Sequence, residues 1–109
     1  MAPAGGPVDD SPLDDYTEQV LSAVEAIPAG SVMTYGDLAE LIGLGGPRQV
    51  GQVMARYGGA VPWWRVVRAD GRPARGHESR ALQRLAAEGA PLRRDRVELR
   101  SARYRPDAP

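Results

Sequence analysis

Two short helical segments joined by a glycine-bearing turn constrain the fold of this chain more than any other part of its sequence. Thr34 is suited to cap a helix over residues 35–42, and Pro47 is suited to open a second helix that ends near Tyr57. Residues 43–46, of which three are glycine, form the turn between them. This order predicts a helix-turn-helix, a motif whose second helix usually contacts DNA.

The second of these helices combines a small residue with polar side chains. Val50 and Val53 supply its inner face, whereas Gly51 has no side chain to obstruct a close approach. Small and polar residues near a helix N-terminus suit contact with phosphates, because free N–H groups and the helix dipole favour an anion. The residues of this motif that we expect to contact DNA are Thr34, Gln49, Gly51, Gln52 and Arg56.

Apolar residues recur at three- and four-residue spacing over residues 13–27 and predict a longer helix before this motif. After the motif, Val66 and its neighbours predict a short strand, and Asp70-Gly71 is typical of a tight turn. The sequence thus indicates a mainly α fold, a winged helix-turn-helix DNA-binding domain with a small β wing. We assign residues 13–105 to this domain and residues 1–12, rich in Ala, Gly, Pro and Asp, to a disordered tail.

The C-terminal part of the domain is expected to hold one more helix and a second small strand. The helix covers residues 79–88 and is followed by Gly89, a residue that commonly ends helices. Its inward-facing residues are expected to be Leu82, Leu85 and Ala86. Alternation of apolar and polar residues predicts the strand over residues 97–99, and Tyr104 is expected to pack near the C-terminus.

Charge is segregated along the chain, although its formal net charge is zero. Residues 1–40 hold eight acids and no Arg or Lys, whereas residues 41–109 hold all fourteen arginines and six acids. The second part therefore carries a balance of +8. Such an asymmetry favours a polyanion as the partner of the C-terminal part.

Composition excludes several kinds of site. The chain has no Cys and a single His, so it offers neither a disulfide nor a Cys- or His-rich metal site, and we expect no metal and no cofactor. His77 lies in a polar, glycine-flanked stretch and is expected to be an ordinary surface residue. No apolar run reaches the roughly 18 residues of a membrane span and no secretory signal is evident, so we expect a cytoplasmic protein without membrane contact.

The segment Val61-Pro62-Trp63-Trp64-Arg65-Val66-Val67 places two adjacent tryptophans after a proline. Together with the helix-turn-helix pattern upstream, it resembles the active-site segment of O6-alkylguanine-DNA alkyltransferases, which is Pro-Cys-His-Arg-Val. Trp63 stands at the position of the cysteine and Trp64 at that of the histidine. Because the thiol is absent, the resemblance is to the alkyltransferase-like proteins, which bind alkylated DNA without repairing it. It covers roughly Tyr16 to Tyr104.

The resemblance also implies roles for three further segments. Arg48-Gln49-Val50-Gly51 resembles the Arg-Ala-Val-Gly segment of the family, whose arginine enters the base stack from the minor groove and fills the space of an extruded nucleotide. Thr34-Tyr35 resembles a Thr/Ser-Tyr pair whose tyrosine helps to rotate that nucleotide, although a core position for Tyr35 is the alternative. Residues 72–76 resemble the lesion-binding loop, with Arg75 as the first candidate for contact with the base and Arg72 as the second.

We expect the extruded base to enter a largely apolar pocket, where aromatic stacking restores part of the free energy lost on unstacking. The residues expected to line this pocket are Tyr35, Met54, Trp63, Val66 and Arg75. The alternative is that Trp63 and Trp64 both cap the helix-turn-helix as core residues. For Trp64, a core position and a pocket position both stay open.

Alkyl transfer needs a thiolate and an adjacent base, and tryptophan supplies neither, since its indole N–H has no basic lone pair. We therefore expect a protein that is not an enzyme. The resemblance implies double-stranded DNA containing O6-alkylguanine as the ligand and hand-over of the lesion to nucleotide excision repair proteins. The alternatives are a winged-helix transcription regulator that reads an operator and a divergent alkyltransferase, against which the missing thiol argues. No dimer seam is evident, and we expect a monomer.

Overall fold

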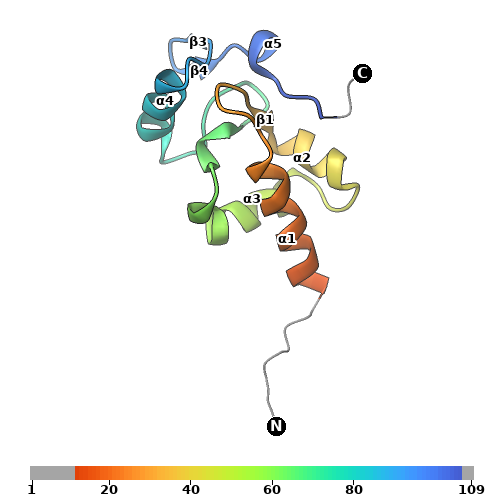
Figure 1. Ribbon diagram of the computed structural model, residues 1–109. Helices are drawn as coiled ribbons and strands as arrows, with labels where there is room; N and C mark the ends of the chain where they lie inside the picture. The colour runs from red at the N-terminus through yellow and green to blue at the C-terminus, as the bar shows by residue number, and fades with distance from the viewer. Residues whose placement is uncertain (1–11, 107–109) are drawn as a thin grey trace.

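The computed structural model of the chain describes residues 12–106, with side chains from residue 15 onward (Figure 1). Its α-helices are α1 (Pro12–Glu25), α2 (Tyr35–Ile42), α3 (Pro47–Tyr57), α4 (Glu78–Ala87) and α5 (Leu99–Ala102). Its strands are β1 (Met33–Thr34), β2 (Val66–Val67), β3 (Leu92–Arg93) and β4 (Arg96–Val97), and two 3-10 turns are η2 (Gly58–Ala60) and η3 (Trp63–Arg65). The mainly helical fold with small sheets confirms the predicted fold class.

The predicted tail, residues 1–12, lies outside the described residues except for Pro12. Because α1 begins at Pro12, the first helix starts one residue earlier than predicted. A proline suits the first helical position, where no N–H bond within the helix is lost. The same helix ends at Glu25, before the predicted limit at residue 27, because Pro28 disfavours helical backbone in the residue that precedes it.

The helices α1, α2 and α3 enclose the first of two hydrophobic cores. Val20, Val24 and Ile27 are at most 1% exposed, since their spacing places them on one face of the N-terminal segment. They pack in one cluster with Leu38 of α2 and Val50 of α3, which are both fully buried. The helix-turn-helix is therefore backed by α1 on its inner side.

The helix-turn-helix has the bounds that the sequence predicts. The Thr34 hydroxyl accepts a hydrogen bond from the Asp37 N–H (2.9 Å), and the Asp37 carboxylate accepts one from the Thr34 N–H (3.1 Å). This capping box starts α2 at Tyr35. Pro47 occupies the first turn of α3, where the Gln49 side chain accepts a hydrogen bond from the backbone of the preceding turn.

A short parallel pair of strands joins the two halves of the domain. β1 pairs with β2 in the register Met33↔Val66 and Thr34↔Val67. Parallel strands need a crossover connection, and here α2, α3 and the Trp63 segment form it. The pairing fixes the tryptophan segment next to the start of α2.

The second core lies between β2, α4 and the antiparallel hairpin β3–β4. Val32, Val67, Leu85 and Val97 form its centre, and each is at most 2% exposed. In Figure 1, α4 and the hairpin lie together, apart from α3. No helix within residues 12–106 has the length and apolar character that a membrane crossing requires.

The C-terminal elements differ slightly from the expectation. α4 lies one residue earlier than predicted and is followed by Gly89 in the left-handed conformation (φ +81°). Leu85 is buried as predicted and Leu82 is half-buried, but Ala86 is exposed and Ala81 is buried. Residues four apart lie on the same face of a helix, so Ala81 shares the inner face with Leu85, whereas Ala86 is turned away from it.

The strand predicted over residues 97–99 is also shifted. β4 covers residues 96–97 and pairs with β3, while Leu99 begins α5. The strand ends there because the Glu98 carbonyl accepts hydrogen bonds from the Ser101 and Ala102 N–H groups (both 3.1 Å), which starts a helical turn.

Candidate nucleic-acid interface

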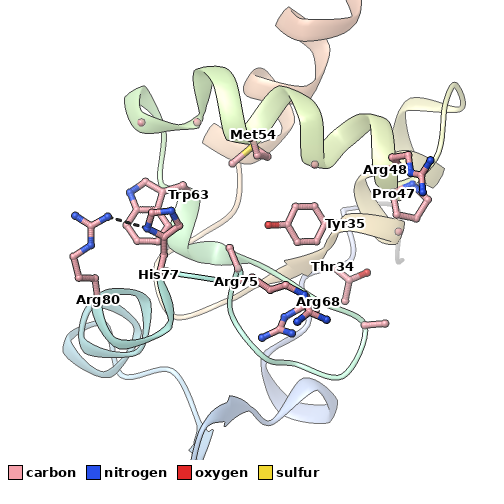
Figure 2. A pocket seen from close by; sticks show the side chains of 17 residues that line it. Thr34, Tyr35, Pro47, Arg48, Met54, Trp63, Arg68, Arg75, His77 and Arg80 are labelled. Atoms are coloured by element: carbon pink, nitrogen blue, oxygen red, sulfur yellow. Dashed lines mark hydrogen bonds between the residues drawn. The ribbon is translucent and has the colours of Figure 1, made fainter.

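A cleft of about 900 Å³ opens between α3 and the segment that follows β2 (Figure 2). The start of α2 and η3 complete its walls. Pro47 and Arg48 lie at one end of the cleft and Trp63 and His77 at the other, with the ring of Tyr35 between them. The cleft therefore runs beneath the second helix of the helix-turn-helix.

The face of α3 toward the cleft is open. Gly51 lines the cleft, and apart from its chain neighbours and the adjacent backbone of α3 no heavy atom lies within 4 Å of the place that a Cβ would occupy there. Arg48 is exposed at the first turn of the same helix. A helix with free backbone groups, a missing side chain and an exposed arginine in its first turns suits close contact with a phosphate backbone.

Tyr35 lines the cleft from the first residue of α2 and is half-buried. Burial raises the pKa of its phenol, and the positive charge of nearby Arg68 partly opposes that rise. Its hydroxyl therefore stays protonated around neutral pH and is available as a hydrogen-bond donor. The structure thus places Tyr35 in the cleft, while its ring also packs against the first core.

Trp63 forms the wall at the inner end of the cleft. Its ring meets that of Trp64 edge to face, with centroids 5.8 Å apart and planes at 88°. The His77 ring lies 5.7 Å from it, and the guanidinium carbon of Arg80 lies 5.4 Å from its centroid. These contacts leave Trp63 half-buried, with Met54 of α3 lining the same cleft.

Trp64 is turned away from the cleft and packs against the second core. Its Nε1–H donates a hydrogen bond to the Glu88 carboxylate (2.8 Å), and the Arg84 guanidinium lies over its ring at 4.5 Å. Glu88 also forms an ion pair with Arg65 (2.6 Å) and accepts a hydrogen bond from the Gly30 N–H (3.0 Å). Of the two positions left open by the sequence, Trp64 occupies the core position.

The environment of Glu88 stabilises its charged form. Burial alone would raise the pKa of this carboxyl group, but the hydrogen bonds from Arg65, Gly30 and Trp64 outweigh burial and lower the pKa below its usual value. A carboxylate that accepts this many hydrogen bonds is held in one place. It therefore fixes the indole of Trp64, on which Trp63 rests.

The two candidate loop arginines take different positions. Arg75 lines the cleft and is exposed. Arg72 instead forms ion pairs with Asp70 (2.6 Å) and Asp95 (3.2 Å) and does not line the cleft. The structure therefore brings Arg75 to the site and leaves Arg72 outside it.

The other expected site residues take different positions, and most of them lie outside the cleft. Val66 was expected in the pocket, but it is 1% exposed and belongs to the first core, because its pairing with Met33 sets it among the core side chains. Thr34 lines the cleft, yet its hydroxyl already caps α2. The remaining three, all exposed on α3 outside the cleft lining, are Gln49, Gln52 and Arg56.

Sequence reasoning did not assign Arg68, His77 and Arg80 to the site, although all three line the cleft. Arg68 is held by a hydrogen bond from its Nε to the Pro73 carbonyl (2.9 Å) and by a 3.6 Å ion pair with Glu78. The sequence signal for these residues is the short connection between β2 and α4. A short connection keeps the start of α4 close to the tryptophan segment that precedes β2.

The lining of the cleft combines an aromatic and aliphatic wall with positive charge. Among the described residues, four arginines and one histidine line it, and no Asp or Glu does. Within residues 12–106, no group of three His, Asp or Glu side chains is placed to hold a metal ion. Such a cleft can bind an anionic polymer and accept a flat aromatic ring, whereas its described residues offer no activated nucleophile.

Comparison with known proteins gives the class of this domain. The family model of the DNA-binding domain of 6-O-methylguanine DNA methyltransferase matches residues 15–90. The fold and the cleft thus define a helix-turn-helix DNA-binding domain of the methyltransferase class.

The relatives narrow this class further. A DNA base-flipping protein of Vibrio parahaemolyticus is 31% identical over 100 residues, which cover 86% of this chain and 100% of that protein. The alkyltransferase-like protein 1 of Schizosaccharomyces pombe is 37% identical over 87 residues, 73% of this chain and 81% of that protein. The chain belongs to the alkyltransferase-like family.

The solved structures agree with this family. The S. pombe alkyltransferase-like protein in complex with DNA has a TM-score of 0.76 and 31% identity, covering 85% of this chain and 97% of that chain. The same protein in complex with damaged DNA containing O6-carboxymethylguanine gives the same values.

Proposed function

We propose that this protein recognises O6-alkylguanine in double-stranded DNA by rotating the damaged nucleotide into the cleft, and that it leaves the alkyl group in place. The observation that carries the proposal is the inner end of the cleft. There, Trp63 lines the cleft, and by the sequence resemblance it corresponds to the family's acceptor cysteine, in a chain that contains no cysteine. The names of the relatives, a base-flipping protein and a protein solved with damaged DNA, support the same function.

The cleft offers a separate group for each part of this task. Arg48, at the outer end, is placed to fill the gap that the extruded nucleotide leaves in the base stack. Tyr35 lies between this end and Trp63, where it helps the nucleotide to rotate. Trp63 and Met54 then pack against the base and its alkyl group, which offsets part of the unstacking cost of a few kcal/mol.

Replacing a cysteine by an indole converts a reaction site into a binding site. Trp63 has no thiol, and Trp64 donates its only N–H to Glu88, so neither can act as nucleophile or base. The bound lesion has to be passed on, and we assign this step to nucleotide excision repair proteins. Because DNA is the ligand, the place of action in a bacterium is the cytoplasm.

A winged-helix regulator of transcription is the alternative. It requires α3 to read base edges with its exposed polar residues and gives the cleft no task. A cleft of about 900 Å³ lined by Trp63 and Arg75 favours lesion binding over this alternative.

The test compares matched duplexes that contain guanine or O6-methylguanine at one position, at the same salt concentration, and repeats the comparison in several unrelated sequences. We expect tighter binding of the modified duplex and an unmodified protein mass after incubation. A protein that gains the mass of a methyl group, or that binds both duplexes equally and prefers one sequence, contradicts the proposal. The second result would favour the regulator.

A further inference from the structure

The inner end of the cleft carries a cation beside its aromatic wall. His77 and Arg80 come from the start of α4, and Trp63 comes from η3 (Figure 2). The Arg80 Nη2 lies 3.1 Å from the His77 Nδ1, and both side chains contact the Trp63 ring, at 5.4 Å and 5.7 Å between centres. The guanidinium is therefore held next to the ring.

The charge of Arg80 is not balanced by an acid of the described part of the chain. Within residues 12–106, no carboxylate forms an ion pair with Arg80, and no acid lines the cleft. Arg68, in the same lining, pairs with Glu78, and Arg72 pairs with two aspartates. Arg80 thus keeps hydrogen-bond donors free for an external anion.

The position of Trp63 tells which part of the lesion reaches this end. An alkyl group that is transferred to a cysteine must lie beside the sulfur, and by the sequence resemblance Trp63 corresponds to that cysteine. The O6 substituent of a base in this cleft therefore points toward Trp63. A substituent longer than methyl extends along the Trp63 ring toward His77 and Arg80.

We propose that Arg80 and His77 form a subsite for a negative charge on the alkyl group, so that the cleft prefers O6-carboxyalkylguanines to neutral O6-alkylguanines of equal size. A methyl group offers nothing to a guanidinium, whereas a carboxylate accepts charge-assisted hydrogen bonds from it. This subsite rests on the proposed function, because it requires the base to be in the cleft. The S. pombe relative was solved with DNA that contains a lesion of this class.

The test uses duplexes of one sequence, at one ionic strength, that contain guanine, O6-methylguanine, O6-carboxymethylguanine or O6-carbamoylmethylguanine. The last is the amide of the carboxylate and has nearly the same size without the charge. The wild-type protein should bind the carboxylate about three- to fivefold more tightly than the amide, the range of one partly exposed ion pair. Arg80→Gln should bring this ratio to about one, while O6-methylguanine should still be bound more tightly than guanine.

Arg84→Gln is the matched control. It removes the same charge from the same helix, but Arg84 lies over Trp64 and does not line the cleft, so the ratio should keep its wild-type value. Equal binding of carboxylate and amide by the wild type contradicts the subsite. An equal loss on all four duplexes in Arg80→Gln also contradicts it and makes Arg80 a phosphate contact. Neither result touches the proposed function, which fails if O6-methylguanine is bound no better than guanine or if the protein gains the mass of a methyl group.

Discussion

Trp63 and Trp64 are neighbours in the sequence, but their rings have different surroundings. Trp63 faces the cleft with Arg80 and His77 beside it, whereas Trp64 donates its N–H to Glu88 and packs against the second core. Because the hydrogen bond to Glu88 holds the Trp64 ring in place, the edge-to-face contact between the two rings also restricts the Trp63 ring. The first ring is therefore a preformed wall for a flat ligand.

Trp63→Cys tests whether a thiol at position 63 is sufficient for alkyl transfer. The new thiol has Trp64 instead of a base beside it, so its pKa should stay near that of a free cysteine, with only about a few per cent thiolate at neutral pH. We expect little or no transfer from O6-methylguanine DNA, measured by protein mass, and slow transfer once Trp64→His is added. Rapid transfer by the single variant would show that the site activates a thiol without the histidine.

Arg48→Ala tests the arginine at the outer end of the cleft. Without its side chain the gap in the base stack stays empty, and the nucleotide returns to the duplex. We expect a loss of about 1–3 kcal/mol in the binding free energy for O6-methylguanine DNA. Gln19→Ala, which shortens an exposed polar side chain on α1 outside the helix-turn-helix, is the control and should leave this affinity unchanged. An unchanged dissociation constant for Arg48→Ala, with intact helix content by circular dichroism, would exclude this role.

Arg75→Ala should affect discrimination more than general affinity. Arg75 lines the cleft and meets the base only after rotation, so its loss should narrow the ratio of affinities for modified and unmodified DNA. Arg72→Ala should leave this ratio unchanged, because Arg72 is engaged with Asp70 and Asp95. Both variants are measured on both duplexes. Equal losses on the two duplexes for Arg75→Ala would assign this residue to the DNA backbone instead.

At the scale of elements, the position of the helix-turn-helix depends on its first cap. Asp37 closes the capping box with Thr34 and accepts two hydrogen bonds of 2.9 Å from Arg103, which follows α5. Residues far apart in the sequence thus meet at the start of α2. Tyr35 is the first residue of α2 and lines the cleft, so the hydrogen bonds that cap the helix also fix the position of Tyr35.

Asp37 should make stability depend on pH. Burial alone would raise the pKa of this carboxyl group. The hydrogen bonds from Arg103 and Thr34 outweigh this effect, so the pKa lies below its usual value. The stabilisation is therefore complete above the unfolded pKa of about 4 and is lost as the pH falls through the folded pKa. We expect the free energy of unfolding of the wild type to fall more steeply below about pH 4 than that of Asp37→Asn. Equal pH dependence of the two free energies of unfolding, measured by urea denaturation, would contradict this role of Asp37.

At the scale of the whole molecule, local signals predicted the helices better than the lining of the cleft. Thr34, Pro47 and Gly89 each act within a few residues of themselves, so they could be recognised in the sequence as helix ends. The burial of Val66 depends on its pairing with Met33, over thirty residues away, and no local pattern contains that partner. The contact between Arg80 and Trp63 likewise depends on the fold of the segment between them, so no local pattern predicts it.

Because the arginines all lie in the C-terminal part of the chain, we expect the affinity for DNA to depend on salt through individual arginines of this part. Each phosphate contact that is lost reduces the slope of log K against log salt by about 0.9 on duplex DNA. Arg56→Gln removes a charge from the exposed last turn of α3 and should lower this slope by about one, equally for modified and unmodified duplexes. Arg94→Gln removes the same charge from the turn of the β3–β4 hairpin, which lies apart from α3 (Figure 1), and should leave the slope unchanged. A smaller slope for Arg94→Gln and not for Arg56→Gln would place the DNA on the hairpin side of the molecule, away from the cleft.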